Sequence, residues 1–145
     1  MQLDNLYQEV ILDHYKHPLN KMLNPTFTAQ VHHVNPSCGD EITLNVNISD
    51  GIVTSVTWEG VGCSISQAST SIASDLMTGK NLEEALKIVE SFSDLMSSKG
   101  TMAGDEDILE DGVALAGVSK FPARIKCALL GWMAFKDAAI QSSKN

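Results

Sequence analysis

The feature that most constrains the fold is a change of hydrophobic periodicity near residue 60. Over residues 41–58 apolar and polar residues alternate, which is typical of strands with one buried face. Asp50-Gly51 divides this stretch and is a common two-residue hairpin turn. After residue 62 apolar residues recur every three or four positions, which predicts amphipathic helices. Strands followed by helices predict an α+β domain, with helices packed on one face of a small antiparallel sheet.

The same patterns give the expected bounds of each element. The expected strands are Thr28–Val34, Glu41–Ser49 and Ile52–Trp58. The expected helices are Leu3–His17, Cys63–Met77, Leu82–Met96, a short one over Asp107–Ala116, and a long one from Pro122 to about Ser142. Pro18 ends the first helix, Asn81 is a suitable N-cap, and Pro122 fits a first helical turn.

Two sets of side chains are expected to face the core. In the third strand, alternation places these four on one face: Ile52, Thr54, Val56 and Trp58. In the last helix, spacing turns these five inward: Ile125, Leu129, Trp132, Met133 and Ile140.

Length and charge narrow the class of protein. The 145 residues are expected to form a single domain spanning 1–145, large enough to bury a core. Neither an apolar run long enough to cross a membrane nor a secretory signal is evident, so a cytoplasmic location is the expectation. A net charge of −8 argues against broad nucleic-acid binding, and is compatible with solubility or with a protein partner that presents a positive surface.

The number of cysteines and their sequence context limit what these residues can do. The chain has three cysteines, an odd number, and no export signal, so a disulfide framework is not expected. Three alternatives remain: inert core thiols, a redox pair with one thiol to spare, or metal ligands.

Each cysteine has a neighbourhood that favours metal binding. Residues i and i+2 of an extended chain point to the same side, so the thiol of Cys38 and the carboxylate of Asp40 can converge on one ion. Cys63 follows a Gly-Val-Gly turn and opens a helix, whose positive end favours thiolate. Cys127 lies three residues after Arg124 in the last helix, which places both side chains on one face.

Together these residues supply the four donors of a tetrahedral zinc site. Three thiolates and one carboxylate around Zn²⁺ leave a net negative charge, which Arg124 would offset in part, unless it instead holds Asp40 in place. The spacings between the cysteines match no zinc-finger pattern, so the fold itself would assemble the site. The histidines are assigned no role: His14 lies on an apolar helix face, and His32 and His33 point to opposite sides of a strand.

Four sequence stretches resemble the SufU branch of the SufU/IscU family of iron–sulfur cluster assembly proteins. They are LYQEVILDHYKHPLNK (6–21), NPSCGDEI (35–42), EGVGCSIS (59–66) and GVSKFPARIKC (117–127). IscU-type scaffolds carry a histidine immediately before the third cysteine, and this chain has Lys126 there. The segment between the second and third cysteines is also longer than in IscU, as in SufU.

The resemblance implies a zinc-dependent sulfurtransferase for iron–sulfur cluster assembly. It implies that Cys38, Asp40, Cys63 and Cys127 bind zinc, that Cys38 accepts persulfide sulfur, and that Arg124 lies beside the site. The implied partners are a pyridoxal-phosphate cysteine desulfurase of SufS type and downstream assembly machinery. Two alternatives remain open: an IscU-type scaffold that carries a transient iron–sulfur cluster, and a binding module whose zinc is structural.

Overall fold

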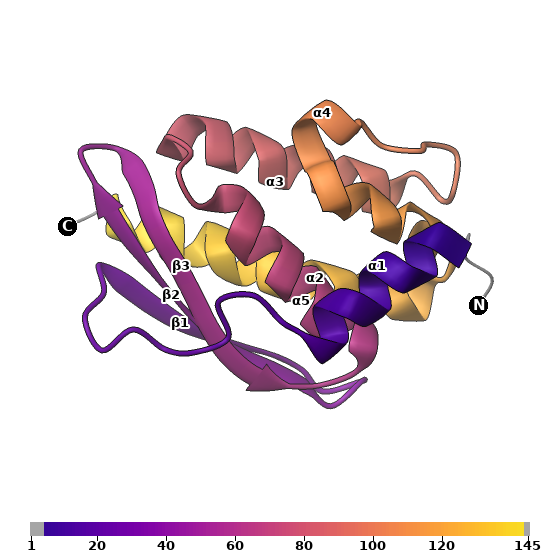
Figure 1. Ribbon diagram of the computed structural model, residues 1–145, viewed down its shortest axis with the longest axis horizontal. Coiled ribbons are helices and arrows are strands. Elements are labelled where there is room, and N and C mark those ends of the chain that lie inside the picture. Colours follow the sequence, from indigo (N-terminus) through magenta and orange to yellow (C-terminus); the bar gives the residue numbers. More distant parts are fainter. Residues whose placement is uncertain (1–4, 144–145) are drawn as a thin grey trace.

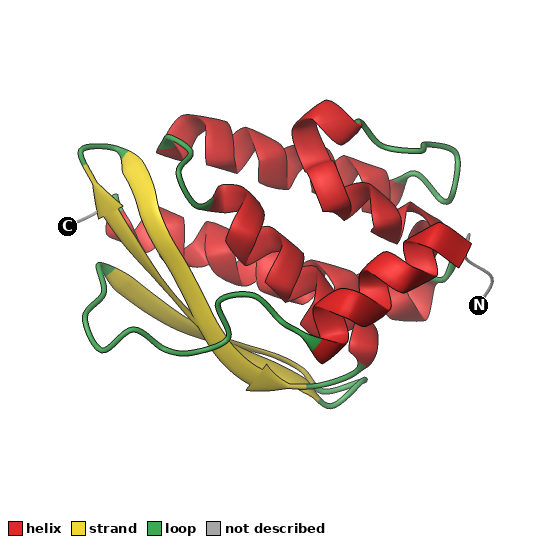
Figure 2. Cartoon of the chain, in the orientation of Figure 1, coloured by secondary structure: helices red, strands yellow, loops and turns green. Residues whose placement is uncertain are grey.

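The computed structural model describes residues 5–143 and has the α+β architecture that the sequence predicts. Three antiparallel strands form one sheet in the order β1-β2-β3, and the helices lie on one side of it (Figure 1; Figure 2). Buried apolar side chains from the sheet and the helices form one hydrophobic core between these two layers. None of the helices within residues 5–143 has the length and apolar character needed to cross a membrane.

The strands are β1 (Ala29–Asn35), β2 (Asp40–Ser49) and β3 (Ile52–Val61), so the expected strands are confirmed to within one to three residues at their ends. β3 is longer than expected because Glu59, Gly60 and Val61 continue its pairing with β2. Gly60 allows this close pairing, since a Cβ atom there would collide with the backbone carbonyl of Glu41. The extension carries the chain to Cys63, beside the first residue of β2.

A β-bulge changes which residues of β3 face the core. The register shifts between Asn47 and Ile48 of β2, where β3 contains one extra residue. Val53 is therefore buried together with Val56 and Trp58, whereas Ile52 is 39% exposed. The prediction that Ile52 and Thr54 share the inner face with Val56 and Trp58 was wrong, because strict alternation does not allow for an inserted residue.

The helices also agree with the sequence except in the segment before the last one. They are α1 (Asn5–Lys16), α2 (Ser64–Met77), α3 (Leu82–Ser97), α4 (Glu106–Leu109) and α5 (Pro122–Ser142). The expected start of the first helix at Leu3 lies outside the described residues. In place of one short helix over Asp107–Ala116, α4 is followed by a 3₁₀ helix, η1 (Glu110–Lys120). This tighter segment contains two glycines, which disfavour a regular α-helix.

α5 packs against both the sheet and the helices, and its expected inner face is confirmed except at Ile140. Of the five residues expected to point inward, Trp132 is fully buried, Ile140 is 39% exposed, and three are partly buried against the core: Ile125, Leu129 and Met133. Small residues such as Ala128 and Ala134 are buried as well, because α5 contacts α2 as well as β1 and β2. Trp132 stacks on Phe92 of α3 with 4.0 Å between ring centroids, which ties α5 to α3.

α1 lies across α2 and η1 and is fastened by one buried histidine. His14 forms hydrogen bonds with Ser71 Oγ of α2 at 2.8 Å and with Asp111 Oδ2 of η1 at 2.9 Å. The hydroxyl of Ser71 also accepts the backbone N–H of Leu19, just beyond α1. The expectation that His14 is packed is therefore confirmed, and its role is to hold three elements together.

Candidate metal centre

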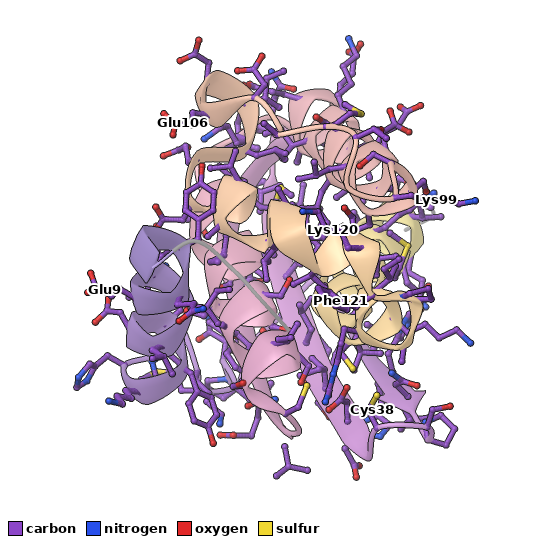
Figure 3. All side chains as sticks on the ribbon, turned by 90° about the vertical axis from the view of Figure 1, so that its right-hand side faces the viewer. Glu9, Cys38, Lys99, Glu106, Lys120 and Phe121 are labelled. Atoms are coloured by element: carbon purple, nitrogen blue, oxygen red, sulfur yellow. The ribbon has the colours of Figure 1, made fainter. Side chains whose placement is uncertain are left out.

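Three of the four expected metal ligands gather where the β1–β2 turn meets the start of α5. The sulfur atoms of Cys38 and Cys127 and a carboxylate oxygen of Asp40 all lie within 4.8 Å of one another, a group that could hold a metal ion. Figure 3 places Cys38 at one end of the molecule, with Phe121, the residue before α5, above it. The site therefore joins segments that are far apart in the sequence.

A tight turn presents Cys38 and Asp40. The carbonyl of Asn35 accepts the backbone N–H of Cys38 at 3.2 Å, and Asn35 pairs with Asp40 across the turn. Gly39 has a φ of +67°, a left-handed conformation that side chains disfavour, and this explains the glycine between the two donors. The side chains of Cys38 and Asp40 consequently converge, as expected, but through a left-handed turn rather than the extended chain on which the i, i+2 prediction was based.

The two thiols are in direct contact. The sulfur of Cys127 lies 2.8 Å from that of Cys38, and each thiol is 3.8 Å from the same carbonyl oxygen, that of Ala123. Cys127 is fully buried, whereas Cys38 is half-buried at the surface. Burial raises the pKa of the Cys127 thiol far above its usual range, and contacts with Cys38, Asp40 and Cys63 raise it further. Cys127 therefore keeps its proton unless a nearby cation stabilises the thiolate.

Asp40 provides the strongest evidence that the site suits a cation. Its side chain is 1% exposed. Oδ1 accepts the backbone N–H of Cys63 at 2.9 Å, but Oδ2 is buried and has no hydrogen-bond partner of good geometry among residues 5–143. A buried carboxylate oxygen without a partner is costly, by about 1–3 kcal/mol. Bound to a cation, this oxygen would find the interaction it lacks, so the donor set fits a metal that accepts sulfur and carboxylate ligands.

Cys63 adjoins this group but uses its thiol differently. It is the N-cap of α2, and its sulfur accepts the backbone N–H of Ser66 at 3.5 Å. Its sulfur is not one of the three gathered ligand atoms, although it contacts the thiol of Cys127. Gly62 lets the chain pass closely here, because a Cβ atom at that position would collide with Asp40 Oδ1. The expected helix-terminal position of Cys63 is confirmed, with Ser64 rather than Cys63 as the first helical residue.

Arg124, the expected charged neighbour of the site, lies near Cys63. It is exposed in the first turn of α5 and forms no ion pair within residues 5–143. Together with Cys63 it lines an open pocket of about 480 Å³, whose remaining lining comes from α1 and the first turn of α2. Arg124 therefore adjoins Cys63 at this pocket, and its guanidinium forms no ion pair with Asp40.

The strand histidines lie apart from the three gathered donors. His32 contacts Thr43 and Glu41 on the sheet, whereas His33 forms a hydrogen bond with Asp137 of α5 at 2.8 Å. Lys126, which precedes Cys127, is exposed. The described site thus draws its donors from cysteine and aspartate.

Sequence reasoning missed two groups that border the thiols. The amide of Asn35 is buried and lies 3.9 Å from the sulfur of Cys127. The carbonyl of Ala123, in the first turn of α5, lies 3.8 Å from both thiols. Asn35 stands three residues before Cys38, a spacing that signals a turn; nothing in the sequence points to a backbone carbonyl.

Comparison with known proteins shows that the chain is similar to iron–sulfur cluster assembly proteins. Residues 6–128 match the family described as NifU-like N terminal domain. The chain is 47% identical over 135 residues to the "Zinc-dependent sulfurtransferase SufU" of Bacillus subtilis, covering 92% of this chain and 89% of that protein. It is 38% identical over 143 residues to the "Iron-sulfur cluster assembly scaffold protein IscU" of Streptococcus pyogenes, covering 98% and 87%.

A solved structure shares the fold as well. The crystal structure of FiSufU from Fervidobacterium islandicum AW-1 superposes with a TM-score of 0.83 at 31% identity, covering 90% of this chain and 94% of that one.

Proposed function

The chain belongs to the family of NifU-like N-terminal domains, which includes SufU and IscU proteins, and from that premise we propose that it is a zinc-dependent sulfurtransferase. In this proposal the chain accepts persulfide sulfur from a cysteine desulfurase and passes it on for iron–sulfur cluster assembly. The observation that carries the proposal is the buried Asp40 Oδ2, which has no hydrogen-bond partner of good geometry in the described part of the chain and lies beside the thiols of Cys38 and Cys127.

The donor set favours zinc. Three thiolates and one carboxylate match the sulfur and oxygen ligands that Zn²⁺ takes in tetrahedral sites, and Lys126 supplies no imidazole. We propose Cys38, Asp40, Cys63 and Cys127 as the ligands, with Cys63 giving up its contact with the Ser66 amide to become the fourth. When bound, zinc would hold thiolates deprotonated near neutral pH without taking part in electron transfer.

Cys38 is the proposed sulfur acceptor because it is the more accessible of the two touching thiols. Its sulfur is half-buried in a surface turn, whereas Cys127 is sealed in the core. In the transfer step the Cys38 thiolate attacks the outer sulfur of the partner's persulfide. The partner's sulfur–sulfur bond breaks, the partner leaves as a thiolate, and Cys38 carries the new persulfide.

Arg124 is proposed to stabilise the negative charge that gathers during this step. Its exposed guanidinium and Cys63 share one open pocket at the edge of the site. A guanidinium keeps its charge at any working pH and can hydrogen-bond a thiolate or carboxylate. Arg124→Lys, which retains the charge, should keep more sulfur-transfer rate than Arg124→Ala.

A reconstitution tests the assignment to Cys38. Zinc-loaded protein is mixed with a pyridoxal-phosphate cysteine desulfurase and L-cysteine, then alkylated, and persulfide on each cysteine is measured by mass spectrometry. Cys38→Ala should carry no persulfide and should not stimulate turnover. Ser37→Ala, an exposed neighbour in the same turn, serves as the matched control and should behave like the unmodified chain. Normal sulfur acceptance by Cys38→Ala would refute the proposed role.

A second function, an iron–sulfur scaffold, is supported by the Streptococcus pyogenes relative, which bears that description. The experiment that separates the two is metal analysis of the purified protein followed by anaerobic loading with iron and sulfide. Zinc at one equivalent and no stable cluster favours sulfur transfer. A stable cluster that moves to an apo acceptor protein favours the scaffold.

A further inference from the structure

We propose that Cys38 and Cys127 are a site of reversible oxidation, forming a disulfide with each other when the protein meets a peroxide. The disulfide would remove two of the proposed metal ligands at once and block the proposed sulfur acceptor. This inference concerns the thiol pair alone, so it can hold whether the site serves sulfur transfer or cluster assembly.

The first step of the argument is proximity. The two sulfurs are 2.8 Å apart although their residues are 89 positions apart in the chain. A disulfide requires a separation of about 2.05 Å, so the sulfurs need to approach by only about 0.8 Å. Both thiols also reach the carbonyl of Ala123, which shows that they occupy the same small space.

The second step is accessibility. Cys38 is half-buried, so a small peroxide can reach it, whereas Cys127 is sealed from solvent. An oxidised Cys38 would therefore form in direct contact with a thiol that the oxidant itself cannot reach. This division resembles the arrangement in which an accessible cysteine is oxidised and a neighbouring cysteine resolves it.

The third step is selectivity against Cys63. The thiol of Cys63 also contacts that of Cys127, but its sulfur is engaged at the N-terminus of α2 by the amide of Ser66 and lies outside the group of ligand atoms that includes the other two sulfurs. A disulfide that includes Cys63 requires this cap to break first. The geometry therefore favours one of the three possible pairings.

The chemistry balances with hydrogen peroxide as the oxidant. The Cys38 sulfur attacks one peroxide oxygen, the oxygen–oxygen bond breaks, water leaves, and Cys38 becomes a sulfenic acid. The Cys127 sulfur then attacks the Cys38 sulfur, and a second water leaves with the Cys127 proton. Two thiols are oxidised to one disulfide and one peroxide is reduced to two waters. A dithiol reductant reverses the change.

The test uses the unmodified chain, so it does not depend on the folding of a variant. Zinc-loaded and metal-free protein are treated with hydrogen peroxide, alkylated, and mapped by non-reducing mass spectrometry. Trypsin alone leaves Cys38 and Cys63 in one peptide, because residues 22–79 contain no lysine or arginine. A second protease that cleaves after Glu41 and Glu59 separates them. A Cys38–Cys127 linked pair, with release of any bound zinc and recovery after dithiothreitol, is the expected result.

Other results overturn the proposal. They are a dominant pair that contains Cys63, a disulfide between two chains, or Cys38 advancing to sulfinic acid while Cys127 stays reduced. Cys63→Ser is the matched variant and should still form the Cys38–Cys127 pair. Because the desulfurase is absent, failure here leaves the sulfur-transfer experiment unaffected, and failure of sulfur transfer leaves this result intact.

Discussion

At the scale of single residues, Asp40 connects the fold to the chemistry of the site. One of its oxygens accepts the amide of Cys63, and the other is buried with no hydrogen-bond partner of good geometry within residues 5–143. The sequence predicts that Cys38 and Asp40 converge, because they are only two residues apart, but not that a left-handed turn at Gly39 brings them together. It does not predict that the thiol of Cys63 caps α2, because that choice depends on how close β3 brings it to the other donors.

Asp40→Asn should affect the metal-free and zinc-loaded proteins in opposite directions. The amide oxygen can still accept the Cys63 N–H, so the turn is kept, but the buried charge is removed. The metal-free variant should gain stability, by about 1–3 kcal/mol. Its zinc affinity should fall at least about tenfold, since it loses an anionic ligand.

Thermal unfolding with and without zinc, together with competition against a chelating dye, measures both effects. Asp94→Asn, which changes an exposed carboxylate on α3, serves as a control for loss of charge alone. Unchanged zinc affinity in Asp40→Asn would remove Asp40 from the ligand set.

Cys127 should make the metal-free protein less stable in alkali. Burial raises the pKa of its thiol in the folded state, whereas an unfolded cysteine titrates near pH 8.5. Above about pH 8.5 the unfolded chain therefore binds fewer protons than the folded one, and folding stability falls as pH rises. The slope for one proton is about 1.4 kcal/mol per pH unit.

Urea unfolding of metal-free protein at pH 7.5 and 9.5 checks this expectation. Cys127→Ala should show a smaller loss of stability between the two pH values than the unmodified chain. An equal loss in both would show that Cys127 does not cause the pH dependence.

At the scale of elements, the sequence predicted most helices and strands well. It did not predict where an inserted residue or a tighter turn interrupts them. Alternation and caps identified all three strands and the helices α2, α3 and α5, because these signals act over a few residues. The bulge in β3 and the 3₁₀ segment η1 were not predicted, because a strict strand or helix period does not allow for an inserted residue or a tighter turn. The buried surface of α5 is wider than predicted, since α5 contacts α2 as well as β1 and β2.

His14 should be the residue that secures α1 to the rest of the molecule. His14→Ala removes its hydrogen bonds to Ser71 and Asp111 and should cost about 1–3 kcal/mol of stability. Amide hydrogen exchange of residues 5–16 should quicken more than that of α5. His17→Ala, an exposed histidine one turn later, is the matched control and should change stability little. Equal effects of the two substitutions would contradict the anchoring role.

At the scale of the whole molecule, the expected site depends on segments that meet only in the finished fold. Residue types and the family resemblance predicted which side chains take part, and the structure places them on the β1–β2 turn, the start of α2 and the second turn of α5. Their distances could not come from the sequence, because they depend on how α5 sits against the sheet.

We propose that residues 1–145 unfold as one domain, and that zinc stabilises the whole of it. Far-UV circular dichroism and tryptophan fluorescence should give coincident unfolding curves. Free zinc at about 100 times its Kd should add about 2.7 kcal/mol, and each added kcal/mol raises Tm by roughly 2–4 °C in a chain of this size. Separate transitions by the two probes would contradict the single domain.

Because Cys127 lies in the last helix, the site is completed only after the rest of the chain has been synthesised. A ribosome makes Cys38 and Cys63 well before α5, and 89 residues separate the two sulfurs that finally touch. Until α5 packs, the thiols of Cys38 and Cys63 lack Cys127, and the packing that buries Cys127 is absent. The nascent chain thus exposes an incomplete set of donors, and the proposed ligand set is complete only once α5 has packed.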